Sequence, residues 1–299
     1  MKKNSCLAIV FAMMNLLGYS QESKPKYVFI ELNHYSDTLK KLGHDILYGE
    51  TDSIRISCKE KFNEAMEKAL NYEASFLYPF DSVKNVSILT APDNSFRILT
   101  WYLPTVSGSS NSFYGYIQTY NKRKNTSKLF PLIDKSDTIT NPQIRKLNTD
   151  CWYGQVYYKM IPCKKGGRKF YTMLGCRWMD KTKTQKIIDV VSVSGDKITF
   201  GLPIFKQKKP LSRMLFTYSA QVVMSLKYNE SNKIITYDHL QPSDPNMVGQ
   251  YEFYGPDGSY DELIFKKGNW ILKADVDVRN PKDKTSTKPR TPTEGNNGR

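Results

Sequence analysis

The spacing of hydrophobic residues predicts helices in the first quarter of the chain. Apolar residues recur at helical intervals over residues 36–47 and again over residues 53–70. Ser36 is placed where it could cap the first of these helices. The apolar run over residues 27–32 instead resembles a short strand. We therefore expect residues 21–80 to form a helical N-terminal region preceded by one strand.

From residue 85 onward the hydrophobic period changes to two, and turn residues become frequent. Short strands at intervals of about 8–12 residues indicate antiparallel meanders that form a sandwich- or barrel-like body over residues 81–278. The fold class is therefore mainly β with N-terminal helices (α+β). The expected strands fall into three sets: 86–90, 96–103, 113–120 and 127–133; 152–161, 169–177, 185–193 and 197–205; 214–228, 233–238, 250–254, 260–265 and 269–273.

The two ends of the chain differ from this body. Lys2 and Lys3 precede an apolar stretch that is too short to span a bilayer and ends at Gly18-Tyr19-Ser20. This pattern predicts a signal peptide over residues 1–20, and export of a protein without a transmembrane segment to the periplasm or the cell exterior. Residues 279–299 are rich in Lys, Thr, Pro and Asn, which predicts a disordered basic tail.

The formal net charge is +15, of which the signal peptide contributes +2 and the tail +4, so residues 21–278 carry +9. Three basic runs, 121–124, 164–169 and 206–209, fall at expected turns. Charged turns keep β-proteins soluble and block edge pairing. Alternatively, the runs form a surface for a polyanion such as lipopolysaccharide or an acidic glycan, which requires them to share one face. We expect no nucleic-acid partner, since no recognition motif is present.

The cysteine spacing favours free thiols. A hairpin that turns at Gly166-Gly167 places Cys163 opposite Phe170 and Cys176 opposite Tyr157. Cys176 then lies about 20 Å from Cys163, far beyond disulfide distance.

Cys151 is equally distant from Cys176 in this register and lies at the other end of the same strand as Cys163. Only Cys58 could therefore pair with Cys151, Cys163 or Cys176, and we expect mostly free, buried thiols. The chain contains no Cys-x-x-Cys motif that would indicate zinc.

Residues 238–261 contain the densest cluster of acidic groups, and three interpretations compete. Two structured turns at 242–245 and 255–258 would give each acid local backbone contacts. A calcium site would use Asp244, Asp257 and Asp261. A hydrolase would use Asp238, His239 and Asp244 for acid–base chemistry.

No catalytic motif accompanies these residues, so the leading prediction is a binding or structural protein of the periplasm or cell surface, with a protein or glycan partner at the envelope. Calcium is the only cofactor that the pattern suggests. Aromatic residues of the first expected meander could contact such a partner: Trp101, Tyr102, Tyr114 and Tyr116.

Four aromatic strand segments, 157–162, 170–175, 200–205 and 216–222, resemble an uncharacterised family of secreted proteins from Gram-negative bacteria. The resemblance covers roughly residues 28–278. It implies export and a helical region followed by a β body, and it carries no activity.

Four tripeptides are similar to the Asp-Ser/Thr-aliphatic signal for periplasmic O-glycosylation in such bacteria, and helix capping is the alternative explanation. The candidate acceptors are Thr38, Ser53, Ser82 and Thr138.

Overall fold

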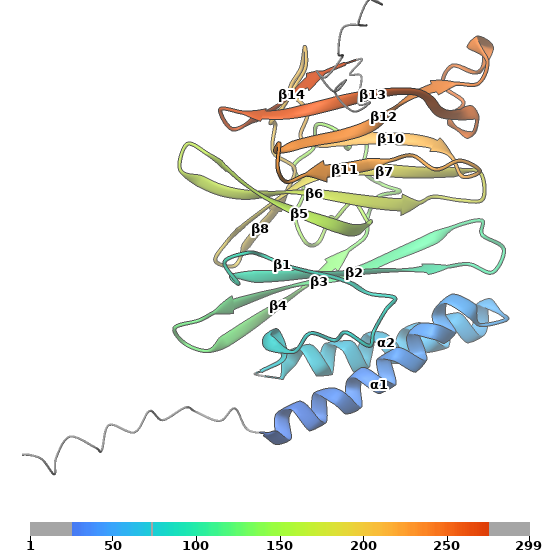
Figure 1. Cartoon of the computed structure of the whole chain (residues 1–299). Helices are drawn as coiled ribbons and strands as arrows, with labels where there is room; N and C mark the ends of the chain where they lie inside the picture. Colours follow the sequence, from blue (N-terminus) through green and yellow to red (C-terminus); the bar gives the residue numbers. More distant parts are fainter. Residues whose placement is uncertain (1–25, 73, 275–299) are drawn as a thin grey trace, which may run out of the picture.

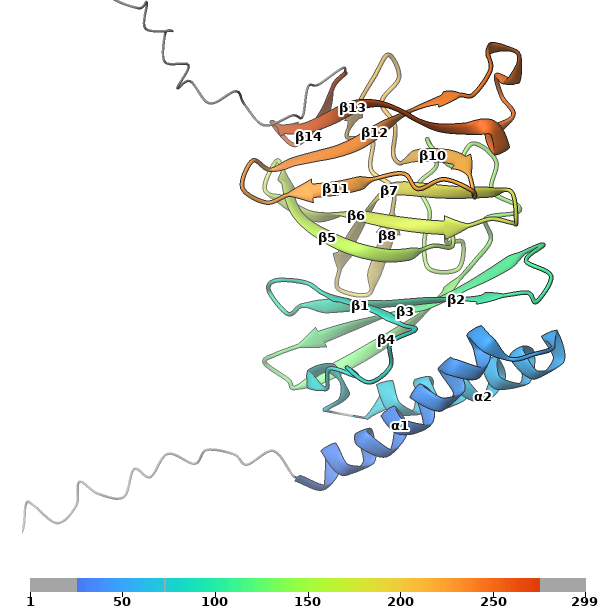
Figure 2. The same ribbon diagram turned by 45° about the vertical axis from the view of Figure 1, so that its right-hand side comes forward.

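The computed structural model describes residues 26–72 and 74–274, and the predicted signal peptide and basic tail lie outside them. One helical layer and three sheets are stacked largely in the order of the sequence (Figures 1 and 2), and the strand pairs are antiparallel except for one parallel pair in the third sheet. Each sheet is open and none of the described sheets closes on itself, so the barrel-like alternative is wrong. Neither helix of the described ranges has the length and apolar character needed to cross a membrane.

The helical layer consists of α1 (Lys26–Tyr48) and α2 (Asp52–Asn71). The strand expected over residues 27–32 is wrong, because α1 runs through it. Leu32, Leu39 and Ile46 lie seven residues apart and are fully buried against α2 and the first sheet. This packing overrides the strand preference of the run. Ser36 is therefore inside α1 and no cap, and its hydroxyl is 2.6 Å from that of Ser82.

The first sheet confirms the expected meander: β1 (Ser87–Thr90), β2 (Phe96–Pro104), β3 (Asn111–Asn121) and β4 (Thr126–Ile133). The 3₁₀ helix η1 (Ser75–Leu77) connects it to α2. Trp101 is 1% exposed and packs edge-on against Phe62 of α2, with Tyr114 and Tyr116 beside it. Tyr102 stacks on Trp178. Trp101 is therefore a core residue and cannot contact a partner, whereas Tyr102, Tyr114 and Tyr116 are half-buried, so partner contact stays a prediction for these three.

The second sheet contains β5 (Val156–Lys165), β6 (Arg168–Trp178), β7 (Lys183–Ser194) and β10 (Met214–Ser219), with β8 (Lys197–Phe200) paired to β7. Its first hairpin has Cys163 opposite Phe170, as predicted. A bulge between Tyr157 and Lys159 then shifts the register, so Cys176 faces Val156 rather than Tyr157.

All four described cysteines are free. Cys163 and Cys176 are buried as expected, whereas Cys58 and Cys151 are half-buried.

The third sheet has the order β11 (Leu226–Asn229), β12 (Ile234–Pro242), β13 (Tyr254–Lys266), β14 (Asn269–Lys273) and β9 (Phe205–Lys206). The long strand expected over 214–228 is two strands in two different sheets, because residues 220–225 form a turn between them. The strand expected over 250–254 is mostly the 3₁₀ helix η3 (Tyr251–Phe253), which follows η2 (Pro245–Met247).

Candidate functional site

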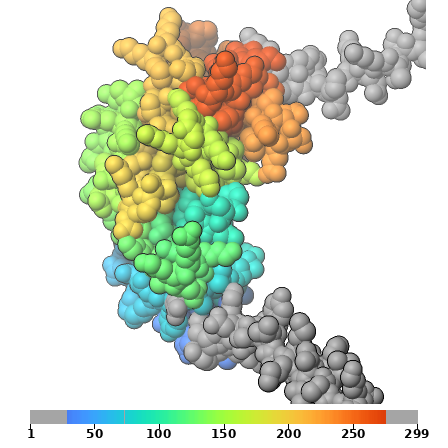
Figure 3. All heavy atoms as spheres, turned by 90° about the vertical axis from the view of Figure 1, so that its left-hand side faces the viewer, coloured from blue at the N-terminus to red at the C-terminus, as the bar shows by residue number. Residues whose placement is uncertain are grey.

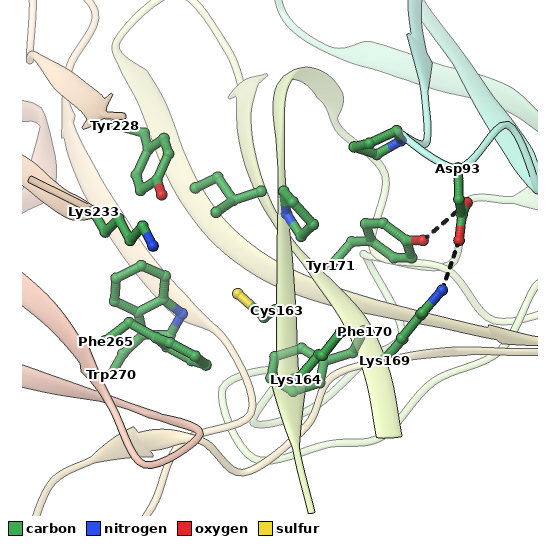
Figure 4. A pocket seen from close by; sticks show the side chains of 13 residues that line it. Asp93, Cys163, Lys164, Lys169, Phe170, Tyr171, Tyr228, Lys233, Phe265 and Trp270 are labelled. Atoms are coloured by element: carbon green, nitrogen blue, oxygen red, sulfur yellow. Dashed lines mark hydrogen bonds and ion pairs between the residues drawn. The ribbon is translucent and has the colours of Figure 1, made fainter. Parts of the chain in front are cut away.

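A cleft of about 560 Å³ follows the outer edge of β5 (Figure 4). We call it cleft A. The turn between β1 and β2 lines it on one side, and the β11–β12 and β13–β14 hairpins line it on the other. Because β5 is an edge strand, no neighbouring strand of its own sheet fills this space. The cleft thus depends on the stacking of all three sheets.

Aromatic side chains form the inner wall of cleft A. Phe170, Phe265 and Trp270 contact one another, with ring centroids 6.3 Å apart for Phe170–Phe265 and 4.9 Å apart for Phe265–Trp270. Trp270 is fixed in place, since its indole N–H donates to the Thr172 hydroxyl over 2.9 Å. Phe265 and Tyr228 are half-buried, so their rings are partly open to a ligand. Phe170 and Trp270 are themselves buried, so Phe265 and Tyr228 supply the flat apolar surface that a ligand can contact.

Lysines surround this wall. The Lys169 ammonium is 3.1 Å from a carboxylate oxygen of Asp93, whose pKa is lowered by its hydrogen bonds with Ser95 and Lys169. Lys164 and Lys233 are exposed, and neither forms an ion pair with any residue of the described chain. The rim of cleft A is therefore positively charged.

Cys163 lies at the base of the cleft with its sulfur 3.4 Å from the Thr172 hydroxyl. Burial raises the pKa of its thiol, and burial also raises the pKa of the neighbouring Tyr171 phenol. A thiol that stays protonated at neutral pH is a poor nucleophile. The cleft combines apolar contact area and cations, an arrangement suited to binding.

The predicted acid–base residues lie elsewhere, at the other end of the third sheet, and each has its own partner. One carboxylate oxygen of Asp238 accepts the backbone N–H of Ser225 over 2.7 Å. His239 occupies a bulge of β12, with its Nδ1 2.9 Å from Asp261. Asp244 is exposed and caps η2 by accepting the N–H of Asn246. These contacts give the hydrolase hypothesis no support.

The predicted calcium ligands are also separate. Asp257 accepts the N–H and hydroxyl of Ser259, which lower its pKa, whereas Asp261 is buried beside His239. Among the residues that the structure describes, no three His, Cys, Asp or Glu side chains are placed to hold a metal ion. The calcium site therefore gains no support.

Only one of the two expected turns reverses the chain. Residues 242–245 lead into η2, as turn chemistry predicts. Residues 255–258 instead belong to β13. Gly258 has a positive φ of 90° and Asp257 binds Ser259 as in a turn, but this turn geometry forms an irregularity within the strand.

The two most deeply buried of the three buried arginines escaped sequence reasoning. Arg213 is fully buried 3.0 Å from the buried carboxylate of Asp189, and the only sequence signal is that Asp189 interrupts the apolar run 187–191. Arg97 is 1% exposed and donates to the Gln118 side chain and to the carbonyls of Ser75 and Tyr78. Both arginines join separate chain segments, which is a structural role.

The four O-glycosylation candidates stay predictions. Thr38, Ser53 and Thr138 are exposed, so an enzyme could reach them. Ser82 is half-buried and hydrogen-bonded to Ser36, which makes it the least accessible of the four.

No family model, curated protein or solved structure matches the chain. The resemblance to an uncharacterised secreted family therefore also stays a prediction, and the site itself is the basis for a functional proposal.

Proposed function

We propose that the protein is a binding protein without catalytic activity, and that cleft A holds a sugar unit carrying an acidic group. The observation that carries this proposal is the pairing of an aromatic wall with Lys164 and Lys233, which have no carboxylate partner in the described chain. Aromatic faces pack against the apolar faces of sugar rings, while ammonium groups bind carboxylate, sulfate or phosphate. A neutral sugar would leave the cations without a partner.

This ligand class agrees with the predicted place of action. A signal peptide would deliver the protein to the periplasm or cell surface, where acidic glycans occur, and a glycan partner at the envelope is one of the two partner classes that the sequence predicts. The hydrolase alternative with Asp238, His239 and Asp244 has no comparable geometric support, because these side chains have separate partners.

Calorimetric titration tests the proposal. The purified protein is titrated with tetragalacturonate, a heparin tetrasaccharide and sialyllactose, each beside its uncharged counterpart: the methyl ester, the desulfated and N-acetylated methyl ester, and lactose. We expect at least one acidic sugar to bind, and its uncharged counterpart to bind at least about tenfold more weakly, since the cations of cleft A need an anion. Equal affinity within every pair, or no binding of any sugar, would contradict the proposal.

A further inference from the structure

Six hairpin turns meet at one end of the β stack, on the face shown in Figure 3. They belong to the pairs β1–β2, β3–β4, β5–β6, β7–β8, β11–β12 and β13–β14, which line three neighbouring clefts. We call this region the basic end. It includes two of the three basic runs found in the sequence, 121–124 and 164–169, whereas the third run, 206–209, lines none of the three clefts, so the condition that all three share one face is met only in part.

The three clefts adjoin one another. Cleft B, of about 790 Å³, lies on the other side of the β5–β6 turn and shares Lys169 and Phe170 with cleft A. Cleft C, of about 670 Å³, lies between the β3–β4 and β7–β8 turns and shares Val193 with cleft B. Each cleft is thus separated from the next by residues that line both, and a long ligand that crosses these residues could reach all three clefts.

The charged side chains of this surface that lack an ion-pair partner are all positively charged. The two carboxylates that line the clefts are already paired, Asp93 with Lys169 at 3.1 Å and Asp196 with Lys128 at 2.5 Å, and Glu230 in the β11–β12 turn pairs with Lys159 at 2.5 Å. The other cations of the three clefts form no ion pair with any described residue: Lys122, Arg123, Lys124, Lys146, Lys164, Lys165, Arg168 and Lys233. Unpaired charges of one sign in adjoining clefts create a potential that concentrates anions.

We propose that the basic end is a track for an extended acidic polysaccharide, with one sugar unit in cleft A and further acidic units in clefts B and C. This inference deepens the proposed function and rests on it. A single acidic sugar can neutralise the cations of cleft A alone, whereas a chain of regularly spaced anions can engage all three clefts. Every added contact is then made within the same complex and raises the affinity.

A polysaccharide fits better than single-stranded nucleic acid. Proteins that bind single strands without sequence preference stack successive bases on repeated aromatic side chains. The aromatic wall is confined to cleft A, because cleft B is lined by only one aromatic residue, the buried Phe170, and cleft C by only Tyr120. Clefts B and C therefore offer cations without a stacking platform.

The test measures how affinity depends on chain length. Oligogalacturonates of 4, 8 and 16 units are titrated into the protein and into the variant Lys122→Gln/Arg123→Gln/Lys124→Gln, which removes three charges from cleft C. The matched control, Lys40→Gln/Lys41→Gln/Lys61→Gln, removes three exposed charges from the helical layer. We expect affinity to rise at least about tenfold from 4 to 16 units. The cleft C variant should lose most of this gain and keep its affinity for the tetramer, and the control should behave as the unchanged protein.

The outcomes separate the two proposals. If the tetramer binds but affinity does not grow with length, or if the cleft C variant keeps the gain, the track is overturned and cleft A stands. If only the longest chain binds, and Lys164→Glu/Lys233→Glu leaves its affinity unchanged, cleft A as the sugar site is overturned. Tighter binding of oligothymidylate or of lipopolysaccharide than of the 16-unit oligogalacturonate at equal salt would assign the surface to that partner and overturn the polysaccharide.

Discussion

The two ends of the β stack gather their polar groups in opposite ways. At the basic end, cleft A takes residues from β5, β6, β11, β13 and β14, which are far apart in the sequence and meet only in the folded protein. At the opposite end, residues 238–261 hold many acids within a short stretch, yet Asp244 and Asp257 bind backbone groups two residues further along. The clustering of acidic residues in the sequence therefore did not indicate that their side chains meet in the folded protein.

The difference follows from the chemistry of the two residue classes. Asp is common in turns because its short side chain reaches neighbouring backbone N–H groups, so an Asp-rich segment tends to satisfy itself. Lys cannot do this, since its long side chain is a donor only. Lysines on several converging turns thus remain available to an external anion.

The largest expected effect is on stability, and it comes from a buried ion pair that lies at neither end of the β stack. Arg213→Met leaves the carboxylate of Asp189 buried without its cation, so the free energy of unfolding should fall by about 3–5 kcal/mol in chemical denaturation. The double variant Asp189→Leu/Arg213→Met should recover part of this loss. Affinity for oligogalacturonate should stay unchanged while the variant is folded. A loss of affinity with full stability would show that the buried pair belongs to the binding site.

Charge reversal at the basic end should give the next largest effect. Lys164→Glu/Lys233→Glu places carboxylates on the rim of cleft A, and we expect affinity for oligogalacturonate to fall at least about tenfold, roughly 1.4 kcal/mol. The matched control is Lys135→Glu/Lys181→Glu, which changes the charge equally at two exposed lysines outside the three clefts. An equal loss of affinity in both variants would show that the effect comes from the net charge of the protein and not from cleft A.

Removing an aromatic contact should have a smaller effect. Tyr228→Ala takes one half-buried ring from cleft A and should weaken binding by about 1 kcal/mol, as expected for one stacked ring. Tyr251→Ala, which removes a ring that is 46% exposed near the opposite end, should leave binding unchanged. Titration of both variants decides whether ring contacts are specific to the cleft.

The smallest effect is expected at the opposite end itself. Asp238→Asn and His239→Gln should change neither the affinity for oligogalacturonate nor the amount of shorter products after long incubation, which we expect to be none. Chromatography of the oligosaccharides measures both points. Cleavage by the unchanged protein that disappears in either variant would restore the hydrolase hypothesis.

The sequence predicted those parts of the fold that depend on local signals. The first meander and the hairpin at Gly166-Gly167 follow from turn residues and alternation, and the register held until the bulge at Tyr157. Residues 27–32 were mispredicted because their apolar run fits a strand or a helix, and contacts with α2 select the helix. Turn chemistry at 255–258 was present, but it forms an irregularity within β13, because pairing with β12 resumes on both sides of residues 257–259.

The candidate site could not be predicted, for a different reason. The basic runs at 121–124 and 164–169 are visible in the sequence, but whether they lie side by side depends on how the sheets stack. Lys233 and Trp270 carried no sequence signal of their own. Their proximity to Lys164 of the second sheet depends on how the third sheet packs against the second, which no local pattern encodes.

Hydrogen exchange measured with and without a 16-unit oligogalacturonate tests the difference between the two ends most directly. The account predicts slower exchange at the turns of the basic end, over residues 121–126, 162–170, 193–197 and 228–234. Residues 104–111 and 243–253, at the opposite end, should exchange at unchanged rates. Protection confined to residues 238–261, with none at the basic end, would contradict the central claim.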